Sequence, residues 1–332
     1  MSLNIIDIAK LAGVSKSTVS RYLNNGYVSK ESGEKIKKVI EETGFRPQSF
    51  AKTLRTGKTN LIGVIVPKIT TEAAPRVVEG ITEVLSPAGY DVLIANTNLS
   101  VDKEIEYLKI FKNKQVDGII FLATKVTPKH IEVMDKLTVP IVVVAQKIEG
   151  YPSVYHDDYN SSRDIVKYLA SKGHKQIGFI GVYEEDISVG YWRKNGYLDG
   201  MKESSLKIQQ ENIKIGDFSS ESGYKYAKEL MEQATRPTAI FAVTDNLALG
   251  AMEYLNEKGI SIPEEVAVIS IGDSKIDRLV TPKLTSMHYY YKTSGRKSAE
   301  IILELLKNNI KQSKNVKKNI KLSYRLVERN SV

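Results

Sequence analysis

The chain of 332 residues contains no cysteine, and no apolar run approaches the ~20 residues that span a bilayer. Without cysteine, a disulfide framework and a thiolate metal site are both excluded, which agrees with a reducing compartment. The N-terminal segment carries an acid, Asp7, and a helical apolar stripe instead of the apolar core of a secretion signal. We therefore expect a globular, cytoplasmic protein of two or three domains without membrane segments.

Signatures of enzymes are also absent. Gly57-Lys58-Thr59 resembles the end of a phosphate-binding loop, but Lys52 stands where that loop requires glycine, and no strand precedes it. No Gly-x-Ser-x-Gly sequence occurs, and the histidines show no metal-ligand spacing. The histidines are His130, His156, His174 and His288. The sequence predicts no catalytic residue, no metal site and no cofactor, which favours a binding protein over an enzyme.

Acidic residues are missing from the stretch GVSKSTVSRYLN, residues 13–24, which carries two cations and several hydroxyl groups. Before it, Ile5, Ile8, Ala9 and Ala12 form an apolar stripe with helical spacing, and Gly13 ends that stripe. The pattern predicts a first helix followed by a turn.

Ser15 is a suitable N-cap for a second helix. In that helix Val19, Tyr22 and Leu23 can pack on the first helix. The outward side chains would be Lys16, Ser17, Thr18 and Arg21. Two short helices joined by a turn with glycine are typical of the helix-turn-helix motif that reads DNA. A helical hairpin with a solvated face is the alternative.

The surroundings of these two helices favour DNA binding. A third amphipathic helix is predicted over residues 32–43, with Ile36, Val39 and Ile40 apolar, so that three helices can enclose a small core. Residues 1–60 contain eleven Lys and Arg against five Asp and Glu, a net charge of +6 out of +9 for the whole chain. A basic three-helix module suits the neutralisation of DNA phosphates.

From residue 61 onward, continuous apolar runs alternate with helical patterns, which predicts parallel sheets with helical crossovers. The predicted strands are 61–67, 91–95, 118–123, 141–145, 177–181, 239–243 and 266–271. The predicted helices include 77–85, 103–111, 162–169, 223–231 and 247–255. We expect two α/β halves that divide near residues 157–160, with a ligand bound between them at the carboxyl ends of the strands.

Residues 46–57 separate the three-helix module from the sheets. Pro47 suits the first turn of a short helix, and Gly57 lies just past its end. A helix of about nine residues is marginal alone, so we expect it to form when another element holds it.

Several segments follow one another in a specific order: residues 6–24, 46–57 and 61–67, Gly173-His174, residues 193–197, 237–240 and 245–250, and Leu284-Thr285-Ser286. In this order they resemble the lactose/galactose repressor family of bacteria. The resemblance implies a dimeric transcription factor with helix-turn-helix headpieces, a hinge helix, and a core like that of periplasmic sugar-binding proteins, with an effector between two subdomains. Residues 145–146, 154–158 and 185–190 are most similar to the sucrose operon repressors of Gram-positive bacteria.

The resemblance also implies a division of the chain into domains. It assigns residues 1–46 to the headpiece, 47–60 to a hinge helix and linker, and 61–332 to the core. Within the core, one subdomain would contain residues 61–158 and 291–322, and the other would contain residues 159–290 and 323–332.

DNA contacts follow from the same resemblance. They would come from Lys16, Ser17, Thr18, Arg21, Asn24, Leu54 and Arg55. Lys16, Ser17 and Arg21 would read base edges, since the Arg fork can match guanine. Thr18 and Asn24 would hold phosphates, and Leu54 would enter the minor groove at the operator centre. The alternative for Leu54 is a core leucine under a linker, which is disfavoured because the surrounding basic and small residues offer little core to join.

The implied effector-binding residues are Gln146, Arg193, Phe218, Thr244, Asp273 and Tyr289. An Arg fork and a carboxylate can bracket adjacent sugar hydroxyls, so Arg193 and Asp273 are the main candidates, and Phe218 offers an apolar face. From the residues alone, Asp273 could cap a turn and Phe218 could be core, while Asp245 is first an N-cap. A phosphate on the ligand would need a cation, for which the candidates are Lys147 and His156.

Other features depart from the family or stand outside its motifs. Residues 71–75, TEAAP, replace a segment that is aromatic in many relatives, which suggests a different or larger ligand. Gly33 replaces a frequent arginine and lowers helix propensity. Residues 307–325 carry seven cations and no acid, and a solvated loop is favoured there over another DNA contact.

Together these inferences predict a repressor of a sugar-utilisation operon, of the sucrose type. It would bind a pseudo-palindromic operator as a homodimer and be released by a sugar or sugar phosphate. A regulator controlled by a protein corepressor and a sugar-binding transport protein are the alternatives. The lack of a secretion signal and the presence of the helix-turn-helix pattern weigh against transport.

Overall fold

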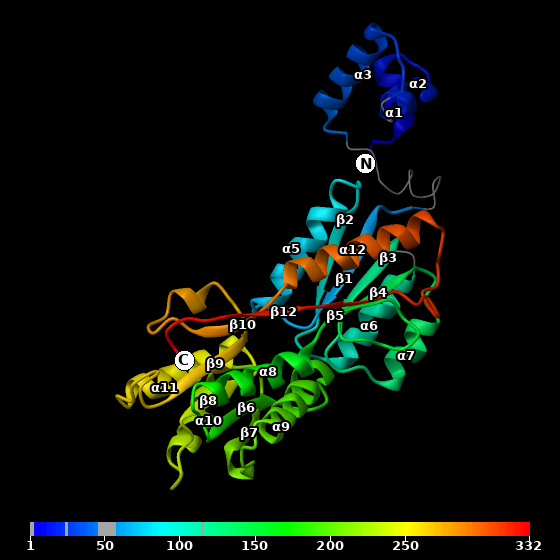
Figure 1. Cartoon of the computed structure of the whole chain (residues 1–332). Helices are drawn as coiled ribbons and strands as arrows, with labels where there is room; N and C mark the ends of the chain where they lie inside the picture. The colour runs from blue at the N-terminus through cyan, green and yellow to red at the C-terminus, as the bar shows by residue number, and fades with distance from the viewer. Residues whose placement is uncertain (1–2, 24–25, 46–57, 114–115) are drawn as a thin grey trace. The chain divides into compact units, whose positions relative to one another are not determined.

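The computed structural model describes residues 3–23, 26–45, 58–113 and 116–332 (Figure 1). They belong to two compact units, Met1–Thr59 and Asn60–Val332. The hinge helix predicted over residues 46–57 lies outside the described residues. Within the described ranges, no helix combines the length and apolar character that crossing a membrane requires.

The first unit, the headpiece, contains three helices, α1 (Ile5–Ala12), α2 (Lys16–Leu23) and α3 (Lys30–Thr43). The side chain of Asn4 accepts hydrogen bonds from the first turn of α1, and the Asp7 carboxylate accepts one from the Asn4 backbone N–H at 2.9 Å. This capping box satisfies backbone groups that the helix leaves unpaired and sets where α1 begins.

One fully buried side chain from each helix forms the centre of the headpiece core: Ile8, Val19 and Ile36. The apolar residues predicted for all three helices belong to this core, which confirms the helix-turn-helix with its third helix. Phe45, which follows α3, also packs there and was not predicted. The third helix begins earlier than expected because Ser29 caps it.

The first of two six-stranded sheets in the second unit has the order β11-β5-β4-β3-β1-β2 and is parallel throughout. Its strands are β1 (Leu61–Val66), β2 (Asp91–Asn96), β3 (Gly118–Leu122), β4 (Ile141–Ala145), β5 (Ser153–His156) and β11 (Asn319–Leu322). The helices packed on it are α5 (Ala73–Leu85), α6 (Val101–Lys112), α7 (Pro128–Asp135) and α12 (Tyr291–Lys307). We call this part the N-subdomain.

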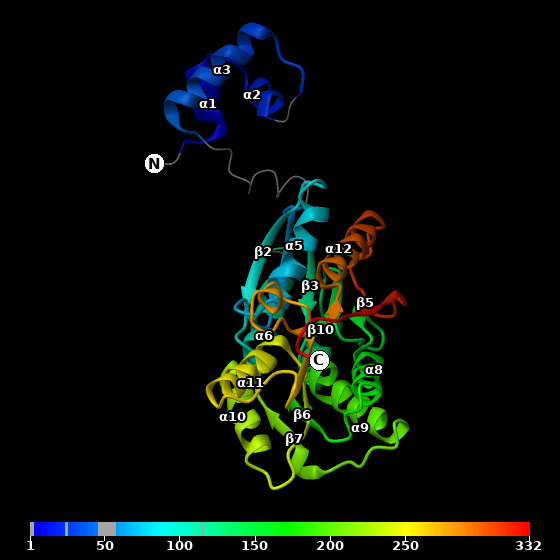
Figure 2. The ribbon, with the colours of Figure 1, turned by 60° about the vertical axis from the view of Figure 1, so that its left-hand side comes forward.

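Burial on both faces explains the continuous apolar runs of these strands. In β1, Ile62 and Val64 pack under α5 and α12, whereas Ile65 belongs to the core under α6 and α7. Helices α5 and α12 lie side by side (Figure 2). A Cβ on Gly80 or Gly295 would lie 2.0 Å from a backbone oxygen of the opposite helix, so glycine is required for this close approach.

The second sheet has the order β12-β10-β9-β8-β6-β7, with only β12 antiparallel to its neighbour. Its strands are β6 (Ile177–Val182), β7 (Ile213–Gly216), β8 (Ala239–Ala242), β9 (Ala267–Gly272), β10 (Thr285–Tyr289) and β12 (Tyr324–Val327). The helices are α8 (Asp158–Ser171), α9 (Arg193–Glu203), α10 (Ser220–Met231) and α11 (Asp245–Glu257), with a π-helix, η1 (Ile187–Trp192), and two short 3₁₀ turns, η2 (Gln210–Asn212) and η3 (Ile276–Arg278). We call this part the C-subdomain.

The chain passes between the subdomains at three places: from β5 to α8, from β10 to α12, and from β11 to β12. The predicted α/β core with two parallel sheets is confirmed, and each predicted strand forms. Strands β5, β7, β10, β11 and β12 were not predicted. Each has only four or five residues and includes polar positions, so it lacks the continuous apolar run used for the prediction.

Candidate functional site

The outward face of α2 carries polar residues predicted to contact DNA. Lys16, Ser17 and Arg21 are exposed, and Thr18 is half-buried. Ser15 caps the helix, since its Oγ accepts a hydrogen bond from the Thr18 backbone N–H at 3.1 Å and lies 2.7 Å from the Ser17 hydroxyl. Hydroxyl groups and the N-terminal backbone N–H groups therefore lie together at one end of α2, where an anionic group is favoured.

The cations of α2 and α3 differ in their partners. Three lysines of α3 each lie 2.7–3.9 Å from a glutamate of the same helix: Lys35 with Glu31, Lys37 with Glu41 and Lys38 with Glu42. In the described part of the headpiece, no carboxylate lies within 4.0 Å of Lys16 or Arg21. The charge of α2 is therefore available to an anionic partner. Asn24, Leu54 and Arg55, also predicted to contact DNA, lie outside the described residues.

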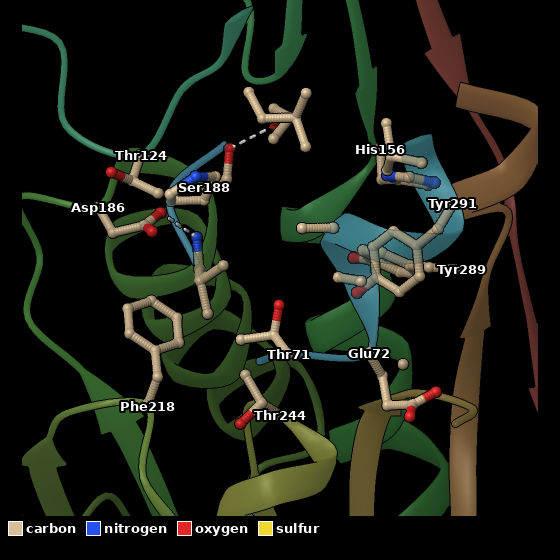
Figure 3. Close-up of a pocket in the computed structure, with 18 of the residues that line it drawn as sticks. Thr71, Glu72, Thr124, His156, Asp186, Ser188, Phe218, Thr244, Tyr289 and Tyr291 are labelled. Carbon is tan, nitrogen blue, oxygen red and sulfur yellow. Dashed lines mark hydrogen bonds between the residues drawn. The ribbon is translucent and has the colours of Figure 1, made fainter. Parts of the chain in front are cut away.

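A pocket of about 180 Å³ lies in the second unit where strands of both sheets end (Figure 3). Its lining follows the carboxyl ends of β1, β3, β4 and β5 in the N-subdomain and of β6 to β10 in the C-subdomain, and it includes the start of α12. Parallel α/β sheets bind ligands at this edge, so the pocket has the position that the sequence predicts.

Arg193, at the start of α9, closes one side of the pocket with a buried ion pair. Its Nε donates a hydrogen bond to Asp158 Oδ1 at 2.7 Å, and its Nη1 donates to the Val243 carbonyl at 2.5 Å. The guanidinium lies 5.0 Å from the centre of the Tyr289 ring, whose hydroxyl donates to Asp158 Oδ1 at 3.0 Å. Arg193 and Asp158 are 4% and 5% exposed. Much of the hydrogen-bonding capacity of the Arg193 guanidinium is therefore taken up by groups of the protein itself.

Aromatic rings form the side of the pocket next to the crossovers. The His156 ring stacks on Tyr289, with centroids 4.4 Å apart, and meets the edge of Tyr291 at 5.4 Å. Burial lowers the pKa of His156 to about 3, and the charge of Arg193 adds to this, so the ring is neutral at pH 7. Figure 3 shows these rings across the cavity from Phe218. They lie where β5 and β10 leave the sheets.

Asp186 is the N-cap of the π-helix η1, and its Oδ1 accepts a hydrogen bond from the Val189 backbone N–H at 2.9 Å. Burial raises the pKa of Asp186 to about 7, although backbone donors and the charge of Arg193 act in the opposite direction. Ser188 is the second residue of the same helix. Its hydroxyl donates a hydrogen bond to the Ala145 carbonyl at 2.7 Å, which joins the two subdomains. π-Helical turns occur frequently at functional sites, and this one borders the pocket.

Asp245, in the first turn of α11, is enclosed by donors. The hydroxyl groups of Ser270 and Ser286 donate to its Oδ1 at 2.6 and 3.0 Å, and the Ser274 backbone N–H donates to Oδ2 at 3.1 Å. Asp245 therefore joins α11 to β9 and β10. The expectation that Asp245 is the N-cap of this helix is wrong, because Thr244 occupies that position and its hydroxyl accepts a backbone N–H bond at 3.4 Å.

Four of the predicted effector-binding residues line the pocket: Arg193, Phe218, Thr244 and Tyr289. Gln146 and Asp273 are not among the lining residues. The Gln146 Nε2 donates to the Thr124 carbonyl at 2.9 Å, which holds the loops after β4 and β3 together.

The Asp273 carboxylate points into an ion-pair cluster. It contacts Arg329 and lies 2.7 Å from His288 Nδ1. Burial acts to raise the pKa of Asp273, but Arg329 and His288 lower it overall. At this end of β9 the pocket is lined by Ile271 and Gly272 instead, and a Cβ on Gly272 would lie 2.1 Å from Asp245 Oδ2.

The polar or aromatic lining residues that sequence analysis missed include Asp158, Asp186, Ser188 and Tyr291. Both aspartates stand where a helix begins after a strand, but helix caps share that signal. Lys147, a candidate for holding a phosphate, is exposed and lies outside the pocket lining. Among the described residues, no three His, Asp or Glu side chains come together in a way that could hold a metal ion.

Comparisons with known proteins agree with this architecture. Residues 4–48 match the bacterial regulatory proteins, lacI family, and residues 166–332 match the periplasmic binding protein-like domain. The sucrose operon repressor of Staphylococcus xylosus is 33% identical over 307 residues, which cover 92% of this chain and 95% of that protein. Catabolite control protein A of Priestia megaterium is 34% identical over 291 residues, which cover 86% and 87%.

A solved structure of the Lac repressor dimer, bound to operator and the anti-inducer ONPF, is similar with a TM-score of 0.88 and 24% identity, covering 100% of this chain and 99% of that chain. The present chain belongs to the lacI family of bacterial regulatory proteins. It is a DNA-binding transcriptional regulator with an effector-binding core, not an enzyme. The family resemblance predicted from the sequence is confirmed.

Proposed function

We propose that this regulator is a repressor of a sugar-utilisation operon, of the sucrose type, which a saccharide releases from its operator. The observation that carries the proposal is the pocket, in which Phe218 lies across the cavity from Tyr289 and Tyr291, with polar groups between them. A saccharide presents C–H faces that suit aromatic rings and hydroxyl groups that suit the polar groups. The similarity to the Staphylococcus xylosus sucrose operon repressor supports the choice of sugar.

Operator recognition is assigned to the face of α2. Lys16, Ser17 and Arg21 would contact base edges, and Thr18 would contact a phosphate. Leu54, Arg55 and Asn24 complete the proposed DNA-binding set. A pseudo-palindromic operator would take one headpiece in each half-site.

Exposed apolar side chains support a homodimer. Leu93 and Ile94, on the edge strand β2, are 42% and 47% exposed, and Ile94 lines a groove with Ile69 and Val78. In the C-subdomain, Leu279 is 79% exposed. Proteins usually cover an apolar sheet edge, and a second copy of the chain would cover this one. The Lac repressor structure that is similar to this chain is a dimer.

Release would follow from a change in the arrangement of the subdomains. The ligand acts through its different affinity for two arrangements. His156, Tyr289 and Tyr291 lie at chain crossovers, and direct contacts between the subdomains border the pocket. One of them is formed by the Arg76 guanidinium, which donates hydrogen bonds to the carbonyl groups of Gly272 and Asp273, at the end of β9, at 3.3 and 3.2 Å. A saccharide between the sheets would favour the arrangement that makes the most contacts with it.

The test is release of the full-length protein from its operator, titrated with sucrose, fructose, trehalose and cellobiose. We expect sucrose or its fructose part to release the protein, and Phe218→Ala to weaken release at least about tenfold while operator affinity is kept. Tyr226→Ala is the matched control, because this half-buried aromatic residue lies outside the pocket. If no sugar releases the protein, the proposal fails and control by a protein corepressor is favoured.

A further inference from the structure

We propose that the pocket selects an unphosphorylated saccharide and rejects the phosphate ester of the same sugar. This inference rests on the proposed function, because it names the ligand class of the same pocket. It starts from the charges of the lining, which holds four carboxylates and two cations. They are Glu72, Asp158, Asp186 and Asp245, with Lys68 and Arg193. A phosphate dianion requires cations or free backbone N–H groups, so their availability decides the ligand class.

Both cations already act on carboxylates of the protein, Arg193 through an ion pair and Lys68 through its charge. Arg193 is bound to Asp158 at 2.7 Å and to a backbone carbonyl, and removing it from that pair would leave a buried carboxylate unpaired. Lys68 is half-buried and lines the pocket together with the exposed Glu72. Its charge also acts on Asp217, whose pKa is lowered chiefly by serine hydroxyl groups and further by Lys68. His156, which could supply a charge if protonated, is neutral.

Helix N-termini beside the pocket do not offer a phosphate site either. The first backbone N–H groups of a helix are a common phosphate site, and α8, η1 and α11 all begin beside the pocket. Each of them already has a carboxylate of the chain in its first turn or at its cap: Asp158, Asp186 and Asp245. These carboxylates occupy the positions that would attract a phosphate, and they would repel one that approached.

Asp186 differs from the other two aspartates in its donors. Asp158 accepts from Arg193 and Tyr289, and Asp245 accepts from two serine hydroxyl groups. Within the described residues, Asp186 accepts hydrogen bonds only from backbone N–H groups of η1. Its carboxylate lies beside the cavity on the side of Phe218 (Figure 3). A sugar hydroxyl can donate a hydrogen bond to this carboxylate, whereas a phosphate dianion has no proton to donate and would be repelled by the carboxylate.

The experiment is calorimetry on the full-length protein at pH 8, where Asp186 and the phosphate are both ionised. The paired probes are sucrose with sucrose 6-phosphate and fructose with fructose 6-phosphate. We expect the unphosphorylated member of a pair to bind at least about tenfold more tightly, because like charges repel strongly in a site shielded from water. Equal or tighter binding of the phosphate ester overturns the inference and leaves the sugar-responsive function standing. If neither member of any pair binds, the proposed function fails and the inference falls with it.

Asp186→Asn tests the residue that carries the discrimination. The amide keeps an oxygen that can cap η1 but removes the charge. The ratio of the affinities for the unphosphorylated and the phosphorylated sugar should therefore fall about threefold or more. Glu185→Gln is the matched control, since it removes the same charge from the neighbouring residue, whose side chain is 58% exposed and lies outside the pocket lining. Its preference should equal that of the wild type. Asp186→Asn with an unchanged preference, in a protein that melts like the wild type, overturns the role of Asp186.

Discussion

The headpiece and the core place their functional side chains in opposite surroundings. On α2, Lys16 and Arg21 stand exposed, without a carboxylate partner among the described residues. In the pocket, Arg193 and Asp158 are at most 5% exposed and bind each other. An exposed side chain contributes to binding with little effect on folding, whereas a buried pair contributes to both. Substitutions in the two regions therefore need different controls.

The strongest test of this contrast is Arg193→Ala. We expect the free energy of unfolding of the core to fall by about 3–5 kcal/mol, because the substitution leaves Asp158 as an uncompensated buried charge. Denaturant unfolding followed by circular dichroism measures this. Lys194→Ala is the control, since Lys194 pairs with the exposed Glu184 on the surface and should cost less than about 1 kcal/mol. A loss for Arg193→Ala no larger than that of the control would contradict the contrast.

Arg21→Ala should show the opposite behaviour in the headpiece. Operator binding should weaken by about 1–3 kcal/mol, with relaxed preference at one base position of the half-site. The free energy of unfolding should change by no more than about 0.5 kcal/mol. Titration against single-base operator variants measures the preference, with the ion-paired Lys35→Ala as the control. An equal loss on every operator variant would make Arg21 a phosphate contact.

The pH dependence of stability tests how burial in the pocket changes the charge of another residue, His156. His156 has a pKa lowered to about 3 by burial and the charge of Arg193, with His288 and Arg76 adding to it. The unfolded chain binds a proton at His156 below about pH 6.5, while the folded protein does not until about pH 3. His156 therefore costs stability as pH falls through this window, by up to about 1.4 kcal/mol per pH unit.

His156→Phe keeps an aromatic ring in the stack but cannot take up a proton. The loss of unfolding free energy between pH 7 and pH 5 should be smaller in this variant than in the wild type. His174→Phe, at a half-buried position outside the pocket, should change this loss less. The same pH dependence in His156→Phe and the wild type would show that folding does not lower the pKa of His156.

Much of the fold could be predicted because it depends on local patterns. Ile8, Val19 and Ile36 were predicted to face inward from helical spacing alone, and all three are fully buried. The continuous apolar runs of strands such as β1 and β4 follow from burial on both faces of a parallel sheet. Short strands such as β11 could not be predicted this way, because pairing with β5, far away in sequence, makes them strands.

The lining of the pocket was predicted less completely than the core of the headpiece. Arg193 and Tyr289 lie in it, but the carboxylate of Asp273 turns toward Arg329, which is 56 residues away along the chain. Asp186 was missed since its sequence position is that of an ordinary helix cap. Which side of a strand end a side chain occupies depends on partners from other elements, and no local pattern contains those partners.

By itself, the sequence determined the family, the helix-turn-helix and the alternation of strands and helices, because spacing along one segment decides which face of a helix or strand is apolar. Only the tertiary structure decided which charges meet in the pocket. It paired Arg193 with Asp158, made His156 neutral and left Asp186 beside the cavity without a side-chain donor among the described residues. The physical reason is that burial and charge pairing depend on distances between segments far apart in the chain, which the folding of two sheets brings together.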